Sequence, residues 1–492
     1  MTMTHALRRL HPVSRVVLLA AGWAASVYDL GAASGTHSMR SAAQATDQTR
    51  PSHESSIPLA DFQARRRTAM DRLADGIVLL HANAGMKRWD EAYFQQDTDF
   101  YYFTGLRNAQ GAILAIDGGV KESWLFVPPA DGGAVPDLTD RDRPYFDAGK
   151  AAEGVFGFDR VVQWDEFEAF VDRRLAGSPR PAIYVDSGGQ TGSQAGARAS
   201  PKGLRGVNNM HVLWSEAIRA RWPDANVRDA WGPLSEVRAV KSPTEIALLR
   251  RAAEVTAAGF RTGLRAIASG KTQRQVEGAV VQGCLDAGSD GPSLWPWVQS
   301  GPNAQPLFEG FFDYSNVNRT LQSGGLVRLD IGCDYHMYKG DFGRTIPVSG
   351  RFSTDQRETL DLLTAAYTAG VAVMKDGATS DDVVRAATAR VQAVMPSLKS
   401  PMAKDAAASL VNNSRQLGIR HGLGLDMADG GVRLMQAGNV ICYEPGVTAN
   451  GDSFFVEDTL LITKTGHEIL NPPLPYLARD IERAMAIERE RR

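Results

Sequence analysis

The chain has 492 residues, of which 43% are hydrophobic and 22% charged, and its formal net charge is −2. This composition is typical of a globular protein, and at about 150 residues per domain the length predicts two or three domains. The sequence has no basic run interleaved with aromatic residues, so nothing in it indicates nucleic-acid binding.

The N-terminus has the pattern of an export signal. Arg8 and Arg9 precede an apolar run from Val16 to Val27, and small residues follow it. The run is shorter than the roughly 20 residues that span a bilayer. We therefore expect residues 1–33 to be a signal peptide. The protein would be periplasmic or secreted, with no stable membrane insertion once the signal is removed. A disordered tail or a misplaced start codon is the alternative.

Residues 34–57 are polar and predict a flexible linker. From residue 58 to residue 235, short apolar runs alternate with helical stretches, which predicts an α/β domain. Its expected strands are 76–81, 112–116, 124–127 and 182–186. Segments rich in glycine and proline, 131–136 and 188–203, are expected to be surface loops.

A capping box with proline at the first helical position, Ser242-Pro243-Thr244-Glu245, marks the start of a second domain over residues 236–475. Apolar residues behind it recur at spacings of three and four, which predicts a long amphipathic helix ending at Gly270. This domain is also expected to mix helices and strands. A charged helix over residues 476–492 closes the chain.

The chain has three cysteines, Cys284, Cys333 and Cys442. A small, odd number of cysteines in a long chain does not form a disulfide framework. We expect all three to be buried free thiols. Such thiols are compatible with export but do not support it.

The most informative stretch is LVRLDIGCDYHMYKGDFGRT, residues 326–345. It predicts a β-hairpin with Asp330 on the first strand, a turn over Cys333–Gly340, and Asp341 at the start of the return strand. Arg328 and Asp330 share one face of the first strand because side chains alternate. Two carboxylates held face to face repel by about 4 kcal/mol at an effective dielectric near 20. Such a pair needs a shared proton or a cation.

Three further candidate ligands lie downstream, two of them in apolar, strand-like runs where a bare carboxylate is costly to bury. They are His421 in IRHGLGLD, Glu444 in VICYEPG and Glu457 in FFVEDTLLIT. Taken singly, each has an ordinary structural explanation. A strand glutamate usually pairs with arginine or lysine, and a lone histidine usually satisfies a local hydrogen bond.

Taken together, these motifs resemble the pita-bread metallopeptidases, which include methionine aminopeptidase, prolidase and, above all, aminopeptidase P. The hairpin resembles the first ligand motif, including the eleven-residue separation of its aspartates, and HGLGLDMAD, YEPG and VEDTLLIT follow in family order. Residues 94–105 resemble the N-terminal domain of aminopeptidase P. The likeness covers residues 58–475 and implies a creatinase-like N-terminal α/β domain followed by a pita-bread catalytic domain.

The resemblance implies that Asp330, Asp341, His421, Glu444 and Glu457 bind two divalent ions. Asp341 and Glu457 would bridge them, Asp330 would complete the shell of one ion, and His421 with Glu444 that of the other. A ligand set rich in oxygen with one imidazole favours Mn²⁺ or a similar ion. The ions would hold a bridging water that is available as hydroxide near neutral pH. Glu444 would take its proton and pass it to the leaving amine.

The chain departs from the family pattern around the expected substrate. Three histidines that the resemblance places near the ions are replaced by Phe308, Leu417 and Ala428, and an arginine expected two residues before the last glutamate is replaced by Phe455. These four residues are candidates for a more apolar pocket. Losing one donor to an oxyanion typically lowers the rate by about 10² to 10³. The segment between the histidine ligand and the last glutamate is also shorter than usual.

The alignment of the metal-binding histidine has an alternative. His421 could match an earlier histidine that is not a ligand, which would put Leu425 at the ligand position. The ligand alignment is preferred because the residues that follow then fall in register. His336, in the hairpin turn, is expected to be solvated and to point away from the ions. His211 and His467 have no motif support.

The leading hypothesis is an exported metalloaminopeptidase that hydrolyses Xaa-Pro peptides. One alternative is a hydrolase of the same fold that cleaves another amide or a dipeptide. The other is a metal-binding family member without catalysis. The replaced histidines motivate both alternatives. The resemblance also implies a homo-oligomer.

Overall fold

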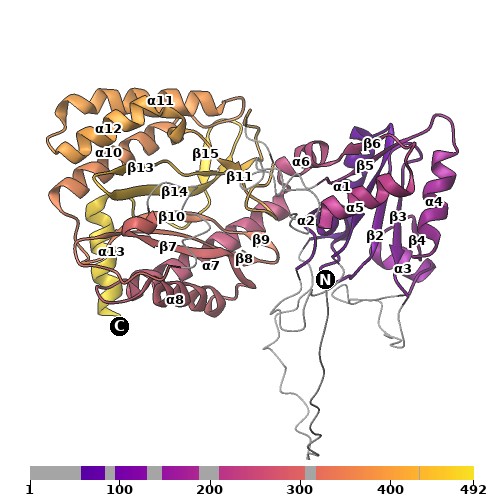
Figure 1. The fold of residues 1–492 in the computed structure, drawn as a ribbon, viewed down its shortest axis with the longest axis horizontal. Coiled ribbons are helices and arrows are strands. Elements are labelled where there is room, and N and C mark those ends of the chain that lie inside the picture. Colours follow the sequence, from indigo (N-terminus) through magenta and orange to yellow (C-terminus); the bar gives the residue numbers. More distant parts are fainter. Residues whose placement is uncertain are drawn as a thin grey trace, which may run out of the picture. The chain divides into compact units, whose positions relative to one another are not determined.

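The structure is a computed structural model that describes residues 57–83, 95–129, 147–187, 210–304, 317–430 and 433–491. The expected signal peptide, residues 1–33, lies outside these ranges, as do Phe308 and all of the expected linker except Ile57. No helix within the described ranges is long and apolar enough to cross a membrane. The described chain contains two sheets with helices packed against them, the first mixed and the second antiparallel in its recorded pairings (Figure 1). The α/β class predicted from the sequence is confirmed.

The first sheet has the strand order β4-β3-β2-β1-β5-β6. Its strands are β1 Gly76–His81, β2 Ile113–Asp117, β3 Glu122–Val127, β4 Arg160–Gln163, β5 Ala182–Val185 and β6 Val227–Asp229. Its helices are α1 Leu59–Arg72, α2 Thr98–Thr104, α3 Lys150–Phe156, α4 Glu166–Leu175, α5 Met210–Arg221 and α6 Trp231–Ala239. The four expected strands are present within two residues of their predicted bounds. The short strands β4 and β6 were not predicted.

Strand β1 shows why this sheet is covered on both faces. Successive side chains of a strand point to opposite faces, so its continuous apolar run needs apolar partners on each side. Val78 and Leu80 lie in one hydrophobic cluster, with residues of α1, α2 and α6. Ile77 and Leu79 lie in another, with residues of α4 and α5.

The second sheet has the order β11-β12-β14-β10-β8-β7, with β13 and β15 paired to β14 and β9 paired to β8. Its strands are β7 Gly291–Ser300, β8 Leu326–Tyr335, β9 Tyr338–Lys339, β10 Phe342–Pro347, β11 His421–Gly422, β12 Val440–Tyr443, β13 Gly446–Ala449, β14 Asp452–Ile462 and β15 His467–Ile469. Its α-helices are α7 Pro243–Ala266, α8 Gln273–Asp286, α10 Thr354–Val371, α11 Ser380–Val394, α12 Pro401–Asn412 and α13 Ala478–Glu490.

Helix α7 begins where the sequence predicts and ends earlier. The Ser242 hydroxyl accepts a hydrogen bond from the Glu245 backbone N–H at 3.2 Å, and the Glu245 carboxylate accepts one from the Ser242 N–H at 2.9 Å. The helix ends at Ala266, so the predicted end at Gly270 is wrong. Ile267 adopts an extended conformation and is completely buried, and this burial takes the chain out of the helix. Gly270 lies beyond it with a φ of +84°.

The hairpin that carries the two aspartates has a much shorter turn than predicted. β8 continues to Tyr335 and pairs with β9, leaving only His336 and Met337 in the turn. Both turn residues have positive φ, as a two-residue type I′ connection requires. Tyr338 is completely buried in the hydrophobic cluster that also contains residues of α1 and α2. Because Tyr338 must be buried, the return strand begins directly after the two turn residues. The predicted turn over Cys333–Gly340 is therefore wrong.

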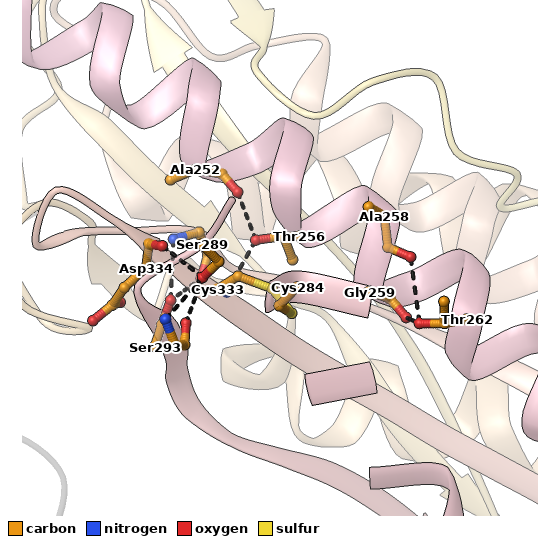
Figure 2. Close-up of a disulfide and its surroundings, with 12 residues drawn as sticks. Ala252, Thr256, Ala258, Gly259, Thr262, Cys284, Ser289, Ser293, Cys333 and Asp334 are labelled. Atoms are coloured by element: carbon orange, nitrogen blue, oxygen red, sulfur yellow. Dashed lines mark hydrogen bonds between the residues drawn. A yellow bond between two sulfur atoms is a disulfide. The ribbon is translucent and has the colours of Figure 1, made fainter. Parts of the chain in front are cut away.

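Two of the cysteines form a disulfide, which corrects the expectation of three free thiols. Cys284 on α8 is bonded to Cys333 on β8, with a Cα–Cα distance of 6.0 Å (Figure 2). Gly259 on α7 leaves room for the Cys284 sulfur, because a Cβ there would collide with it. The Thr256 hydroxyl accepts a hydrogen bond from the Cys333 N–H at 3.0 Å. Cys442 is free and buried, as expected.

Reducing this disulfide should destabilise the second domain. Closing a loop with a sequence separation of 49 residues contributes up to about 4 kcal/mol through the entropy of the unfolded chain. The Cys284→Ala/Cys333→Ala double variant should therefore have a lower melting temperature than the oxidised wild type, measured by calorimetry. Dithiothreitol should lower the melting temperature of the wild type and leave that of the variant unchanged. Equal melting temperatures of the oxidised wild type and the variant would contradict this expectation.

Candidate metal centre

Strand β10 lies between two of the predicted ligands. Its Gly343 pairs with Asp330 of β8 on one side and with Glu457 of β14 on the other. Residues directly opposite each other in a sheet share a face, so both carboxylates flank the side of Gly343 that carries no side chain. Asp341 directly precedes β10, and its backbone carbonyl accepts a hydrogen bond from the Thr459 hydroxyl at 2.5 Å. The three carboxylates have exposed fractions of 4% or less.

Strands β11 and β12 bring the other two predicted ligands to the same place. The Nε2 atom of His421 lies 3.6 Å from Glu444 Oε1 and 3.8 Å from Asp341 Oδ2. Its Nδ1 atom lies 3.1 Å from the Gly422 carbonyl, which can only accept, so Nδ1 carries the proton. Nε2 is then left with its lone pair facing the carboxylates, as a metal ligand requires.

A buried ionic cluster holds the loop that follows His421. The Asp429 carboxylate accepts a hydrogen bond from the Leu425 N–H at 3.1 Å. The same carboxylate pairs with Arg238 at 2.9 Å and with Lys241 at 3.1 Å. Leu425, the alternative ligand position, is buried in a hydrophobic cluster, whereas His421 faces the carboxylates. This geometry favours the alignment in which His421 is the ligand.

The electrostatics of the cluster call for a cation. Burial raises the pKa of Asp330 and Glu444 above their usual values. Burial, and then repulsion by the neighbouring carboxylates, raises the pKa of Asp341 and Glu457 much further. Burial lowers the pKa of His421, so the ring is neutral. Without a cation, these carboxyl groups therefore retain protons at a higher pH than free carboxyl groups would.

Glu457 provides a direct test of whether the residues fit a metal. Its Oε2 atom is buried and has no hydrogen-bond partner among the described residues. A buried carboxylate oxygen without a donor is expensive unless a cation binds it. Together with the neutral imidazole and the other carboxylates, this atom fits a divalent ion.

Cys442 is a potential ligand that the sequence analysis did not identify. Its Sγ lies 3.3 Å from Asp341 Oδ2, and ligand atoms of Asp341, His421, Cys442 and Glu457 all lie within 4.8 Å of one another. Burial raises the pKa of the thiol well above its usual value, which favours the protonated donor. Its position near the end of β12, two residues before Glu444, was the signal in the sequence.

The carboxylates face a cavity of about 680 Å³. Of the candidate pocket residues, Ala428 and Phe455 line it, whereas Leu417 is completely buried in the hydrophobic core. Leu417 ends a 3₁₀ turn, Ser414–Leu417, in which the preceding residue, Gln416, faces the cavity instead. Arg328, Gln416 and Arg420 also line the cavity, and the sequence analysis assigned none of them a role.

The remaining histidines lie elsewhere. His336 lies in the hairpin turn, where its backbone N–H donates a hydrogen bond to the Asp290 carboxylate at 2.8 Å. His211 lies 3.3 Å from Asp97 and from Asp186 in the N-terminal domain. His467 lies on β15. None of the three is among the described residues that line the cavity.

Comparison with known proteins agrees with this geometry. A family model described as metallopeptidase family M24 matches residues 247–464, and one described as aminopeptidase P, N-terminal domain, matches residues 62–184. The Xaa-Pro aminopeptidase of Escherichia coli is 28% identical over 466 residues, which cover 89% of this chain and 100% of that protein. The Xaa-Pro aminopeptidase of Haemophilus influenzae is 27% identical over 463 residues, covering 87% of this chain and 98% of that protein.

Solved structures show the same architecture. Zinc-substituted E. coli aminopeptidase P in complex with product superposes with a TM-score of 0.67 at 25% identity, covering 88% of this chain and 100% of that one. Proline aminopeptidase P II from Yersinia pestis superposes with a TM-score of 0.66 at 25% identity, with the same coverage. The chain thus belongs to the aminopeptidase P-like pita-bread metallopeptidases, and the resemblance seen in its sequence is confirmed.

A divalent cation should stabilise the protein more as the pH rises. The folded-state pKa of the buried carboxyls lies above the unfolded-state value, so their contribution to stability is present at low pH and is lost as the pH rises through the folded-state pKa. A bound ion replaces the protons and restores that stability. The increase in melting temperature with Mn²⁺ should therefore be larger at about pH 8 than at about pH 5. Asp341→Asn should reduce the increase, and Asp480→Asn on α13 should not.

Proposed function

We propose that this metallopeptidase removes the N-terminal residue from peptides whose second residue is proline, and that it uses two divalent ions, with Mn²⁺ the best fit. The observation that carries the proposal is the convergence of Asp330, Asp341, His421, Glu444 and Glu457 on one buried cavity. Relatives named Xaa-Pro aminopeptidase, which this chain matches over nearly their whole length, support it.

In this proposal Asp330, Asp341, His421, Glu444 and Glu457 would together hold the two ions. Oxygen donors with a single imidazole suit Mn²⁺ better than a soft thiophilic ion. When bound, such ions act as Lewis acids and lower the pKa of water towards neutrality. Proton transfer and substrate binding are then carried out by side chains of the protein.

Glu444 is the proposed proton carrier. Its side chain is 17% exposed, more than those of Asp330 and Asp341, so it can reach a substrate in the cavity. Burial raises its pKa towards the working pH, which suits a group that takes a proton from the attacking water and gives it to the leaving amine. The Arg328 guanidinium, 3.9 Å from Glu444 Oε2, attracts the carboxylate electrostatically.

The cavity wall fits a proline-containing substrate. Leu294, Trp297 and Phe455 give it apolar surface, and a pyrrolidine ring has no N–H that would need a partner there. The second candidate, a hydrolase of other amides or dipeptides, is favoured by Ala428, which lines the cavity with a methyl group where the family pattern has an imidazole.

Glu444→Gln should lower kcat on an Xaa-Pro peptide by about 10²- to 10⁴-fold, because the amide cannot carry a proton. Hydrolysis is measured by amino-acid release with Mn²⁺ present. Glu468→Gln on β15, which loses a pairing with Arg250 away from the cavity, is the matched control and should retain activity. The proposal fails if the wild type cleaves no Xaa-Pro peptide. Cleavage of other amides or dipeptides instead would select the second candidate, and no turnover with retained Mn²⁺ binding would identify a non-catalytic protein.

We also propose that the protein is exported. The Cys284–Cys333 disulfide supports this, because such bonds persist mainly in oxidising compartments. The N-terminal pattern of arginines followed by an apolar run supports it independently. Mass spectrometry of alkylated protein from cell fractions should find a processed, disulfide-bonded chain in the periplasm or medium. A full-length, reduced chain confined to the cytoplasm would rule export out.

The chain is further proposed to form a homo-oligomer, on the strength of the family resemblance. Sedimentation velocity of the purified protein tests this directly, and a single species with the mass of one chain at micromolar concentration would refute it.

A further inference from the structure

Arg328 is a buried cation within the cluster of carboxylates. Its side chain is 5% exposed, and its guanidinium donates to Asp330 Oδ2 at 2.8 Å and lies 3.9 Å from Glu444 Oε2. Its Nε has no hydrogen-bond partner among the described residues. A buried arginine is favourable only when nearby charges and polar groups compensate it, so its position depends on these two carboxylates.

Phe455 forms a platform under this guanidinium. The guanidinium carbon lies 3.7 Å from the centroid of the Phe455 ring and 5.7 Å from that of Trp297, which is cation–π geometry. Gly343 makes room for the platform, because a Cβ at this position would collide with the Phe455 ring. The Thr345 hydroxyl accepts a hydrogen bond from the Phe455 N–H at 2.7 Å. This bond fixes the backbone of Phe455 and so helps to position its ring.

Register explains how the arginine reaches this point. Thr345 of β10 pairs with Arg328 of β8, and its hydroxyl binds the Phe455 backbone of β14 on the other side. Arg328 and Phe455 therefore occupy one row across three strands, just as Asp330 and Glu457 flank Gly343 in the next row. A side chain from either end of this row can reach the space beside Asp330.

We propose that Arg328 is a positioning residue of the metal centre, which supplies from β8 the guanidinium that the family pattern places at position 455 on β14. It holds Oδ2 of Asp330, so that the other oxygen faces the carboxylate cluster, and it balances part of the charge of Glu444. Phe455 is then the support of the moved arginine. This inference rests on the proposed function for its effect on turnover, but its effect on metal binding stands separately.

The test compares Arg328→Met with the exchange variant Arg328→Met/Phe455→Arg. Mn²⁺ affinity is measured by calorimetry without substrate, and kcat is measured on an Xaa-Pro peptide. Arg328→Met should lower Mn²⁺ affinity by about 10- to 100-fold, because a ligand carboxylate loses its orienting partner. The exchange variant should recover most of that loss. Arg265→Met, which removes an arginine–carboxylate pair of 2.8 Å with Glu488 between α7 and α13, is the matched control and should bind Mn²⁺ as the wild type does.

Unchanged or tighter Mn²⁺ binding by Arg328→Met would overturn the proposal. Tighter binding is expected if Arg328 only repels the bound cation and does not orient Asp330. A folded exchange variant that binds no better than Arg328→Met would also overturn it. If Arg328→Met does not fold, Arg328→Lys takes its place, and wild-type affinity in that variant would overturn the proposal. The wild type could fail to hydrolyse Xaa-Pro peptides while Arg328→Met loses Mn²⁺ affinity and the exchange variant recovers it. That result would support the role of Arg328 and refute the proposed function.

Discussion

Mutual repulsion among four buried carboxylates is the constraint on which the second domain depends. Asp330 and Glu457 lie within β8 and β14, Asp341 and Glu444 lie at the ends of β10 and β12, and only the sheet brings them together. Such a cluster is costly unless protons or cations neutralise it. Burial strengthens every electrostatic interaction inside the cavity. The carboxylates that repel one another in the empty site would therefore bind a cation strongly.

The surroundings of the cluster respond to this constraint in different ways. The Nε2 lone pair of neutral His421 adds no charge, Arg328 adds one positive charge, and the Cys442 thiol donates to Asp341. The Asp429 carboxylate is neutralised outside the cavity by Arg238 and Lys241, which keeps the His421 loop in place without adding another anion to the centre. The side chains thus compensate only part of the charge of the carboxylates, and protons or a cation must neutralise the rest.

Short-range patterns in the sequence predicted much of this arrangement. The alternating pattern around Asp330 indicated a hairpin with Asp341 at the start of the return strand, and the capping box placed the start of α7. The length of the hairpin turn was not predictable from local residues, because burial of Tyr338 against the first domain's helices decides it. The Cys284–Cys333 bond and the stacking of Arg328 on Phe455 join elements distant in sequence, and only tertiary structure brings them together.

The packing of Phe455 over Gly343 links a glycine to the ligand cluster. Any side chain at position 343 would displace the ring on which the Arg328 guanidinium lies. Because that guanidinium also binds Asp330, a substitution of Gly343 would disturb a ligand position through two other side chains.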